Sequence, residues 1–375
     1  MLLSTSDSLA PSCCPSGPPA VPGREGCSLS ETCWLPATCF VRPSTPQDVG
    51  QVLKAVEQHG SKFAIRCGGH NPNPPFSSID DSGILIDVSE LKTLSLCPDG
   101  VLQMGAGNRW GEVYAYLEEH GRMPIGGRQN GIGLATDRSA GGMPAFPAFH
   151  GFAPDQVQNF EVALADATII NANEKENSEL WEALKGGGPK FAQYTVNTYN
   201  PSDYVNIMNA TAKLQEAMEM DPKLGAFVYV NLTYIAAGLL YAEWGSKFSA
   251  DFYIKVHKIY QEIVQNLQPA PTAAIKFGEL RGGNIMGLEE WDSPANDMLA
   301  QQAIDELYQG MQKMSREEDQ WLDFIFMNEG KWTQDVLASY GEANLQEIKK
   351  IQSKYDPKGV FQNLQNDEYL LRKVA

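Results

Sequence analysis

The sequence has few basic residues and no long apolar run. Only 29 lysines and arginines stand against 46 aspartates and glutamates in 375 residues, which gives a formal net charge of −17. A face that binds phosphate groups needs a local excess of positive charge, so this composition argues against DNA, RNA or an anionic bilayer as partner. The sequence contains no run of eighteen or more apolar residues, and we therefore expect no membrane-spanning segment.

Cysteine is confined to the first quarter of the chain, and the seven cysteines lack the paired spacing with histidine that marks a zinc site. Residues 1–34 are rich in Ser, Pro, Gly and Cys, without a basic stretch followed by an apolar core. They do not form a readable signal peptide, so we expect a disordered lead-in and, by default, a cytoplasmic protein. The sequons at Asn209 and Asn231 leave the secretory route open.

The composition is that of a globular protein, with 43% apolar and 20% charged residues, and the length suggests two domains or one large α/β unit. Helical and extended patterns alternate over the first 120 residues, which is typical of an α/β domain. The elements expected there are helices over 46–59 and 110–117 and strands over 63–65, 84–88 and 101–104.

The rest of the chain mixes a loop, helices and strands. Residues 124–154 are rich in Gly, Pro, Ala and Phe and have no periodicity, so we expect a functional or disordered loop. Residues 355–361 are expected to form a turn and then a strand. The other expected elements are a hairpin over 160–170, helices over 178–184, 205–220, 250–267, 295–314 and 342–354, and a strand over 227–230.

A glycine-rich loop follows the strand expected at 63–65, with the sequence Arg66-Cys67-Gly68-Gly69-His70. Successive glycines let the backbone come close to an oxyanion and offer its N–H groups as donors. Loops at the carboxyl ends of strands are the usual ligand sites of α/β domains. We therefore expect a ligand at this loop, with His70 beside it.

The Arg-x-Gly-Gly-His loop resembles the pyrophosphate loop of the vanillyl-alcohol-oxidase-type flavoproteins, and the chain is most similar to the fungal berberine-bridge-enzyme-like oxidoreductases of secondary metabolism. The resemblance implies a two-domain α/β and α+β fold. Its parts would be a PCMH-type FAD-binding domain over 35–200, a smaller α+β substrate domain over 201–330, and a segment over 331–375 that returns to the first domain. The further stretches that carry it are 105–113, 126–128, 155–188, 339–342 and 355–357.

By this resemblance the cofactor is FAD, attached through His70 or bound without a covalent bond. The alternative for His70 is a structural loop histidine. Some relatives attach the flavin a second time through a cysteine, but Gln129 holds that place here and no cysteine follows Cys97. The resemblance assigns cofactor binding to Arg66, Cys67, Gly68, Gly69, His70, Gly126, Gly127, Gly133, Asp155 and Val157.

The second loop departs from the family pattern. A Gly-Gly pair of the family becomes Ala135-Thr136, and a later glycine triplet becomes Ala140-Gly141-Gly142. A Cβ at a position of close approach can block a cofactor or push the backbone away. Relative to the family pattern, chain is also missing after Gly188 and Trp244. These departures put the retention of FAD in doubt.

The substrate side departs as well. A tyrosine-bearing motif of many relatives reads Phe326-Met327-Asn328-Glu329 here, and a phenylalanine cannot take a proton. We predict Glu329 as the catalytic base, because desolvation can raise the pKa of a carboxylate toward neutrality. Asn328 is predicted as its catalytic neighbour. The alternatives are a solvated acid and a turn residue.

Three functions remain open at this point. The first is an FAD-linked oxidase that takes a hydride from a small substrate and passes the electrons to O2. The second is a redox-silent relative that catalyses a cyclisation, isomerisation or dehydration in the same cavity. The third is a nonfunctional product of an imperfect gene model. None of the three calls for a metal or for a nucleic-acid partner.

Overall fold

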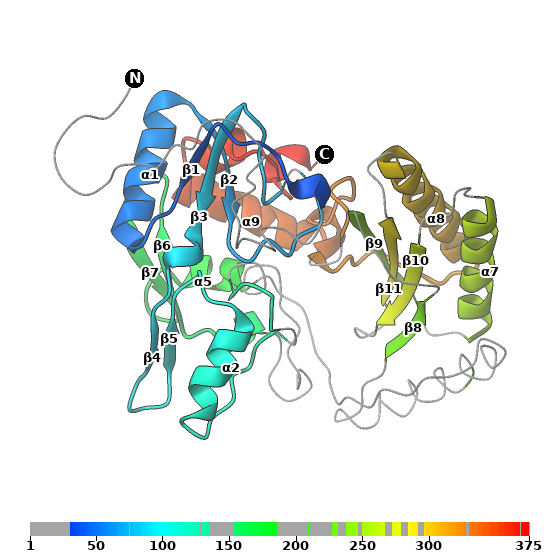
Figure 1. Cartoon of the computed structure of the whole chain (residues 1–375), viewed down its shortest axis with the longest axis horizontal. Helices are drawn as coiled ribbons and strands as arrows, with labels where there is room; N and C mark the ends of the chain where they lie inside the picture. Colours follow the sequence, from blue (N-terminus) through cyan, green and yellow to red (C-terminus); the bar gives the residue numbers. More distant parts are fainter. Residues whose placement is uncertain are drawn as a thin grey trace.

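The computed structural model forms two lobes (Figure 1). The helix expected over 205–220 and most of the loop over 124–154 lie outside the part of the chain that the structure describes. The described residues are 31–74, 76–127, 130–134, 153–185, 209, 227–231, 238–246, 250–266, 272–278, 284–291, 296–327, 330–367 and 369–374.

A three-stranded parallel sheet forms the centre of the first lobe, with the strand order β1-β3-β2. Helix α1 packs against it through Leu53 and Val56, which share a buried cluster with Phe63 and Ile86 of the sheet. The bounds are Cys39–Val41 for β1, Pro46–His59 for α1, Lys62–Arg66 for β2 and Gly83–Asp87 for β3.

Helix α1 begins and ends where its sequence predicts. The Thr45 hydroxyl accepts the Asp48 amide at 3.1 Å, and the Asp48 carboxylate accepts the Thr45 amide at 2.9 Å, which completes a capping box. Pro46 occupies the first turn, and Gly60 closes the helix at a φ of +61°. The prediction of this helix is confirmed.

Two hairpins and two short helices complete the N-terminal part of this lobe. The hairpins are β4–β5 and β6–β7, both antiparallel, and β4 was not expected from the sequence. The bounds are Leu94–Leu96 for β4, Leu102–Met104 for β5, Trp110–Glu118 for α2, Asn159–Ala163 for β6, Ile169–Asn173 for β7 and Ser178–Leu184 for α5. Single 3-10 turns lie at Glu31–Cys33, Val88–Glu90, Ala153–Gln156, Ala338–Tyr340 and Leu371–Lys373.

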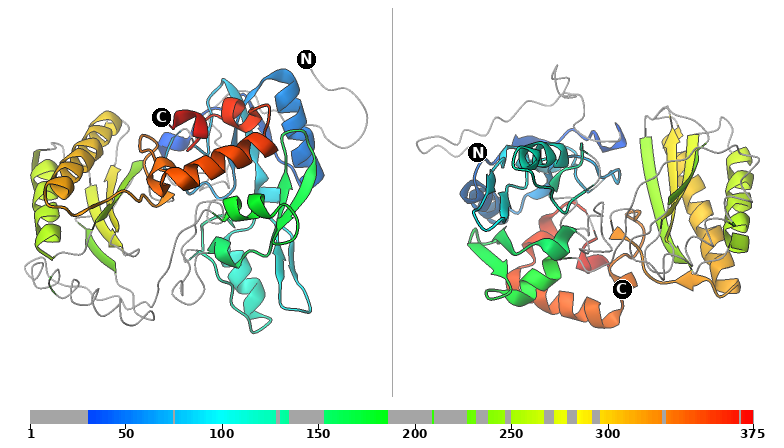
Figure 2. Two further views of the ribbon diagram at one scale, coloured as in Figure 1. Left: turned by 180° about the vertical axis from the view of Figure 1, so that it is seen from behind. Right: turned by 90° about the horizontal axis from the view of Figure 1, so that it is seen from below.

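The second lobe is an antiparallel five-stranded sheet in the order β12-β9-β11-β10-β8, with α7 and α8 on one face (Figures 1 and 2). Helix α8 buries an apolar stripe that includes Ala303, Ile304 and Leu307. The bounds are Phe227–Asn231 for β8, Gly238–Ser246 for β9, Ala250–Asn266 for α7, Thr272–Gly278 for β10, Asn284–Trp291 for β11, Asp297–Glu317 for α8 and Trp321–Leu322 for β12.

After the second lobe the chain returns to the first, where α9 (Glu342–Tyr355) and α10 (Val360–Leu364) lie (Figure 2). Gln365 pairs with Phe63 of β2 as a parallel bridge, and the Asn366 amide donates to Phe63 O at 2.6 Å. The Phe361 ring meets the Phe63 ring edge-on with centroids 6.1 Å apart. The end of the chain therefore completes the first lobe.

The strand expected within 355–361 is wrong, because α10 begins at Val360. Asp356 accounts for the difference: its carboxylate oxygens accept the Val360 amide at 2.7 Å and the Phe361 amide at 3.0 Å. Gly359, with a φ of +65°, reverses the chain immediately before the helix. A carboxylate that takes the first amides of a helix is a capping signal, and the apolar pair Val360-Phe361 obscured it.

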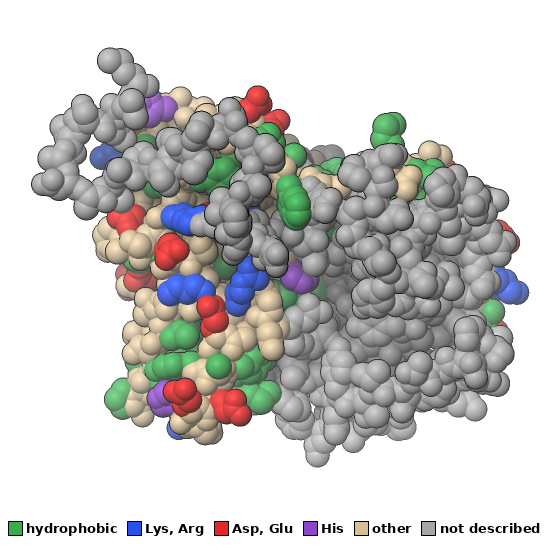
Figure 3. All heavy atoms as spheres, in the orientation of Figure 1, with side chains coloured by type: hydrophobic (Ala, Val, Ile, Leu, Met, Phe, Trp, Pro, Cys, Tyr) green, Lys and Arg blue, Asp and Glu red, His purple; other side chains and the backbone are tan. Residues whose placement is uncertain are grey.

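The exposed face of the first lobe carries both signs of charge, with Lys and Arg side chains lying among Asp and Glu side chains (Figure 3). Within the described ranges, no helix is both long and apolar enough to cross a membrane. The domain boundaries at 34, 200 and 330 stay predictions, and the second of them falls outside the described residues.

Candidate functional site

Strands β2 and β3 end side by side, and their last residues form a buried ion pair. Arg66 and Asp87 are partners in the parallel register, with Arg66 Nη2 3.1 Å from Asp87 Oδ2. Arg42 Nε approaches the same oxygen at 3.9 Å, and Asp87 Oδ1 accepts the Ser89 amide at 3.1 Å. Arg66 thus fixes the point at which the chain leaves the sheet, and its role toward a cofactor stays a prediction.

The two glycine loops expected to bind the cofactor lie against each other. A Cβ added to Gly68 would stand 2.5 Å from Gly133 N, and a Cβ added to Gly133 would stand 2.5 Å from Gly68 N and from Cys67 Sγ. Gly69 follows with a φ of +66°, a conformation that side chains disfavour. Glycine at these positions is required by the approach of one backbone to the other, and this approach brings Cys67, Gly68 and Gly133 together.

Helix α2 holds the second loop in place. Arg109 and Gly133 form an antiparallel bridge, and the Trp110 amide donates to Ile132 O at 3.0 Å. A Cβ on Gly126 would overlap the Trp110 ring, which is fully buried. The Tyr114 hydroxyl donates to Gly127 O at 3.1 Å. Gly126 and Gly127, predicted to approach a flavin, therefore also serve to seat this loop on α2.

The predicted attachment residue, His70, is half-buried and follows Gly69 directly. The loop before it is pinned by Cys67, whose thiol donates to Ala106 O at 2.8 Å. The Cys33 thiol contacts Asn71 O at 3.6 Å, so the end of the expected lead-in reaches this loop. His70 therefore sits between two points at which the loop is held.

Two predicted cofactor residues lie farther along the chain, where the 3-10 turn Ala153–Gln156 leads into β6. Asp155 is exposed. Val157 is buried, and its carbonyl accepts Trp181 Nε1 of α5 at 2.8 Å. These contacts tie Val157 to α5, and the cofactor roles of both residues stay predictions.

The predicted catalytic residues Asn328 and Glu329 lie outside the described residues. Of the same motif, Phe326 is 5% exposed, so an apolar ring is buried where many relatives carry a tyrosine. The Ile325 amide beside it donates to Ser339 Oγ at 3.1 Å. Phe326, the first residue of the motif, and Ile325 before it are thus both buried.

The segment directly after this motif, Gly330–Trp332, is held from both lobes, and sequence reasoning missed the residues that hold it. Asn73 Nδ2 donates to Gly330 O at 3.0 Å, and Asn73 Oδ1 accepts the Trp332 amide at 3.2 Å. Lys331 Nζ lies 2.5 Å from Asp305 Oδ1 of α8. The Asn-Pro-Asn-Pro sequence at 71–74 was the available signal, since such dipeptides mark turns whose side chains bond to backbone.

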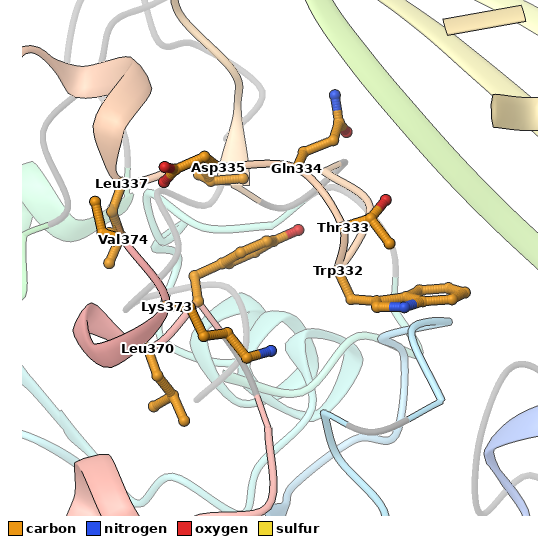
Figure 4. A pocket seen from close by; sticks show the side chains of 10 residues that line it. Trp332, Thr333, Gln334, Asp335, Leu337, Leu370, Lys373 and Val374 are labelled. Atoms are coloured by element: carbon orange, nitrogen blue, oxygen red, sulfur yellow. The ribbon is translucent and has the colours of Figure 1, made fainter. Parts of the chain in front are cut away.

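Two cavities lie near the C-terminal segment, and neither is lined by a predicted cofactor residue. The smaller, of about 190 Å³, separates the stretch 332–337 from 369–374, and Figure 4 shows Leu370 and Lys373 across from Trp332 and Thr333. Burial lowers the pKa of Lys373 there. The predicted cofactor residues thus line neither cavity, and their roles toward a cofactor stay predictions.

Comparisons with known proteins bear on the family and on the cofactor. Residues 37–173 match the FAD binding domain family. An FAD-dependent monooxygenase of Arthrobotrys oligospora is 29% identical over 91% of this chain and 83% of its own length. A bifunctional solanapyrone synthase of Alternaria solani is 26% identical over 87% of this chain and 80% of its own.

Solved structures share the whole fold. A glucooligosaccharide oxidase of Acremonium strictum, described with a 6-S-cysteinyl, 8α-N1-histidyl FAD, superposes with a TM-score of 0.74 at 16% identity, covering 92% of this chain and 94% of its own. A berberine-bridge-like protein of Physcomitrella patens gives 0.72 at 15% identity with the same coverage. These likenesses confirm the expected two-domain fold.

Proposed function

We propose that this chain, a berberine-bridge-like FAD-dependent oxidoreductase whose FAD binding domain matches residues 37–173, oxidises a small secondary-metabolite-type substrate and delivers the electrons to O2. The observation that carries the proposal is the contact between the two glycine loops, at the carboxyl end of β2 and within the matched domain. The fungal relatives support the substrate class, since one of them is named as a synthase of solanapyrone.

The residues present fit an FAD group. A diphosphate needs backbone that no side chain screens. Gly68 and Gly133 lack side chains because each packs on the other's backbone, and Gly69, with a φ of +66°, extends this stretch without side chains. His70 stands directly after these glycines and offers an imidazole nitrogen for attachment. The glucooligosaccharide oxidase, whose FAD is described as histidyl-linked, supports attachment through His70, whereas Gln129 replaces the second attachment residue.

FAD, when bound, would supply the redox chemistry: it would accept a hydride from the substrate, and O2 would take up the two electrons together with two protons as hydrogen peroxide. The protein contributes orientation, exclusion of water and a base. We assign the base to Glu329, because Phe326 in the same motif cannot hold a proton, and we place Asn328 beside it. The buried apolar ring of Phe326 keeps water away from its own position in the motif.

The experiment begins with the purified protein and its visible spectrum before and after acid precipitation. Yellow colour that stays with the pellet supports attachment through His70, and colour released to the supernatant supports FAD bound without attachment. A colourless protein that still converts its substrate would contradict the proposal and favour the redox-silent alternative.

A second measurement decides how oxygen is used. The relatives named monooxygenases raise oxygen insertion as the competing outcome. Turnover under ¹⁸O2 should give labelled hydrogen peroxide and an unlabelled product if the protein is an oxidase. Label in the organic product would show that it is a monooxygenase.

A further inference from the structure

Asn73 is a buried amide that no part of the proposed chemistry uses. It stands three residues after His70 and is 3% exposed, yet its side chain bonds to backbone more than 250 residues away in the sequence. Its Nδ2 donates to Gly330 O and its Oδ1 accepts the Trp332 amide, so the same amide group uses both its donor and its acceptor. A buried amide satisfied on both sides fixes the distance and the orientation between the segments that it joins.

Asn73 is itself held firmly. The backbone amide of Asn73 donates to Asn71 Oδ1 at 2.9 Å, and the backbone carbonyl of Asn73 accepts the Phe76 amide at 3.1 Å. These two bonds close a compact turn directly after His70. A displacement of Asn73 is therefore transmitted to the loop that carries His70.

The opposite segment is held just as firmly. The Tyr369 hydroxyl donates to Gly330 O as well, and the Tyr369 ring meets the Phe76 ring edge-on at 4.9 Å. A Cβ on Gly330 would stand 2.6 Å from the Tyr369 hydroxyl oxygen. This close packing leaves Gly330, the residue that follows the predicted base in sequence, with one position relative to the first lobe.

Lys331 joins the same segment to the second lobe. Its side chain is 2% exposed, and its ammonium pairs with Asp305 of α8, whose carboxylate is partly exposed. The Lys331 amide donates to Gln334 Oε1 at 2.8 Å, and the Trp332 ring lies 5.1 Å from the ammonium. A buried ammonium with one carboxylate partner strongly disfavours separation from it.

We infer that Asn73 is a positioning residue: through Gly330 and Trp332 it sets the segment 330–332 against the loop that carries His70, while Lys331 and Asp305 fix that segment to the second lobe. The inference rests on the proposed function, which assigns the flavin to His70 and the base to Glu329, the residue before Gly330 in sequence. The linkage itself consists of the described hydrogen bonds. A change in the position of the His70 loop should therefore alter the segment 330–332, and the reverse.

The test compares Asn73→Ala with Asn366→Ala. Asn366 Nδ2 donates to Ser78 O at 3.0 Å. This control therefore also removes a hydrogen bond of a side-chain amide between the C-terminal segment and the loops after β2. Hydrogen exchange is measured on both variants and on the wild type, in peptides that cover 66–76 and 330–336. Asn73→Ala should speed exchange by about tenfold in both peptides, as expected for the loss of buried hydrogen bonds.

Two more readouts separate positioning from mere stability. At matched losses of melting temperature, Asn73→Ala should lower the covalently bound flavin fraction and kcat with little change in KM, and it should shift the flavin absorption maximum; Asn366→Ala should do none of these. Asn73→Asp, which keeps the acceptor for the Trp332 amide, should restore protection at Trp332 but not the flavin signature.

Exchange confined to one of the two peptides, or equal flavin behaviour in Asn73→Ala and Asn366→Ala, would overturn the inference. A wild-type protein without flavin would instead defeat the proposed function. In that case the exchange data still decide whether the segment 330–332 and the His70 loop are linked.

Discussion

The two lobes are assembled in different ways. The five-stranded sheet of the second lobe and its helices come from one stretch of chain, from β8 to β12. The first lobe is built from two stretches, because α9 packs onto β7 and α5, and α10 with the residues after it packs onto β2 and α1, although all of them follow the second lobe in sequence. The second lobe is thus an insertion into the first.

This difference makes the first lobe depend on the end of the chain. Ile351 joins the buried cluster of Ala172 and Leu180, and Phe361 and Leu364 pack on the cluster around Phe63. The second lobe has no comparable dependence among the described residues, since its sheet order closes with β12 at 321–322. The predictions below test this asymmetry, beginning with the largest expected effect.

Truncation after Lys350 should unfold the first lobe and leave the second lobe folded. The deletion removes the buried side chains of Ile351, Val360 and Leu370. Each is worth about 1.5–3 kcal/mol, so together about 4.5–9 kcal/mol are lost, which is comparable to the whole stability of a domain. Hydrogen exchange should show lost protection in β2 and β3 and retained protection in α8.

A shorter truncation, after Val374, is the control, because it removes only one residue. It should keep the wild-type melting temperature and flavin content. A Lys350 truncation that also kept them would show that the C-terminal segment is an independent tail, and the asymmetry between the lobes would disappear.

Glu329→Gln should have the next largest effect, because it tests the predicted catalytic base. The substitution keeps the volume and removes the basicity, so turnover should fall by about 10²–10⁴-fold, the usual contribution of a positioned general base. Folding and flavin content should stay unchanged. Steady-state kinetics with the true substrate measure the effect, and a loss of less than about threefold would mean that the base lies elsewhere.

The same asymmetry explains how much of the fold the sequence could predict. Helices α1, α5, α7 and α9 were expected within a residue or so of their bounds, because caps and helical spacing act within a few residues. Strands β9, β10 and β11 were missed. Their pairing depends on partners across the sheet and on the helices that cover it, which no local pattern records.

The site shows the same limit. The glycine loop at Gly68-Gly69 could be found because backbone approach requires a particular residue type in a short motif. The contact of Gly68 with Gly133, and the bonds of Asn73 to Gly330 and Trp332, join residues far apart in the chain. Such contacts follow from the tertiary fold and could not be predicted from the sequence alone.

His70→Ala should abolish covalent flavin and weaken activity without unfolding the protein. It removes the imidazole that would carry the flavin, so acid precipitation should leave no colour in the pellet, and activity should fall less than in Glu329→Gln. The melting temperature should change little because His70 is half-buried in a loop held elsewhere by Cys67. Colour that remains in the pellet of the variant would refute the assignment of His70.

The smallest expected effect concerns the polar contact between α9 and α5, in which Lys354 and Tyr355 bind Glu179. Hydrogen bonds from Lys354, from the backbone and from the Tyr355 hydroxyl lower the pKa of Glu179 from 4.5 to about 2. A carboxyl whose pKa is lowered by folding stabilises the fold above its unfolded pKa, and this contribution is lost as the pH falls from 4.5 toward 2.

Glu179→Gln should therefore lower the melting temperature slightly at about pH 7, and the difference from wild type should shrink below about pH 4.5. The effect is small because Lys354 and Glu179 are largely exposed, where solvent screens the pair. Glu347→Gln is the control: its partner Lys350 lies on the same helix, so the bond it removes joins nothing to the first lobe. If the two variants show the same pH dependence, the ion pair between α9 and α5 contributes no more than a surface pair within one helix, and α9 is held to the first lobe by its apolar contacts alone.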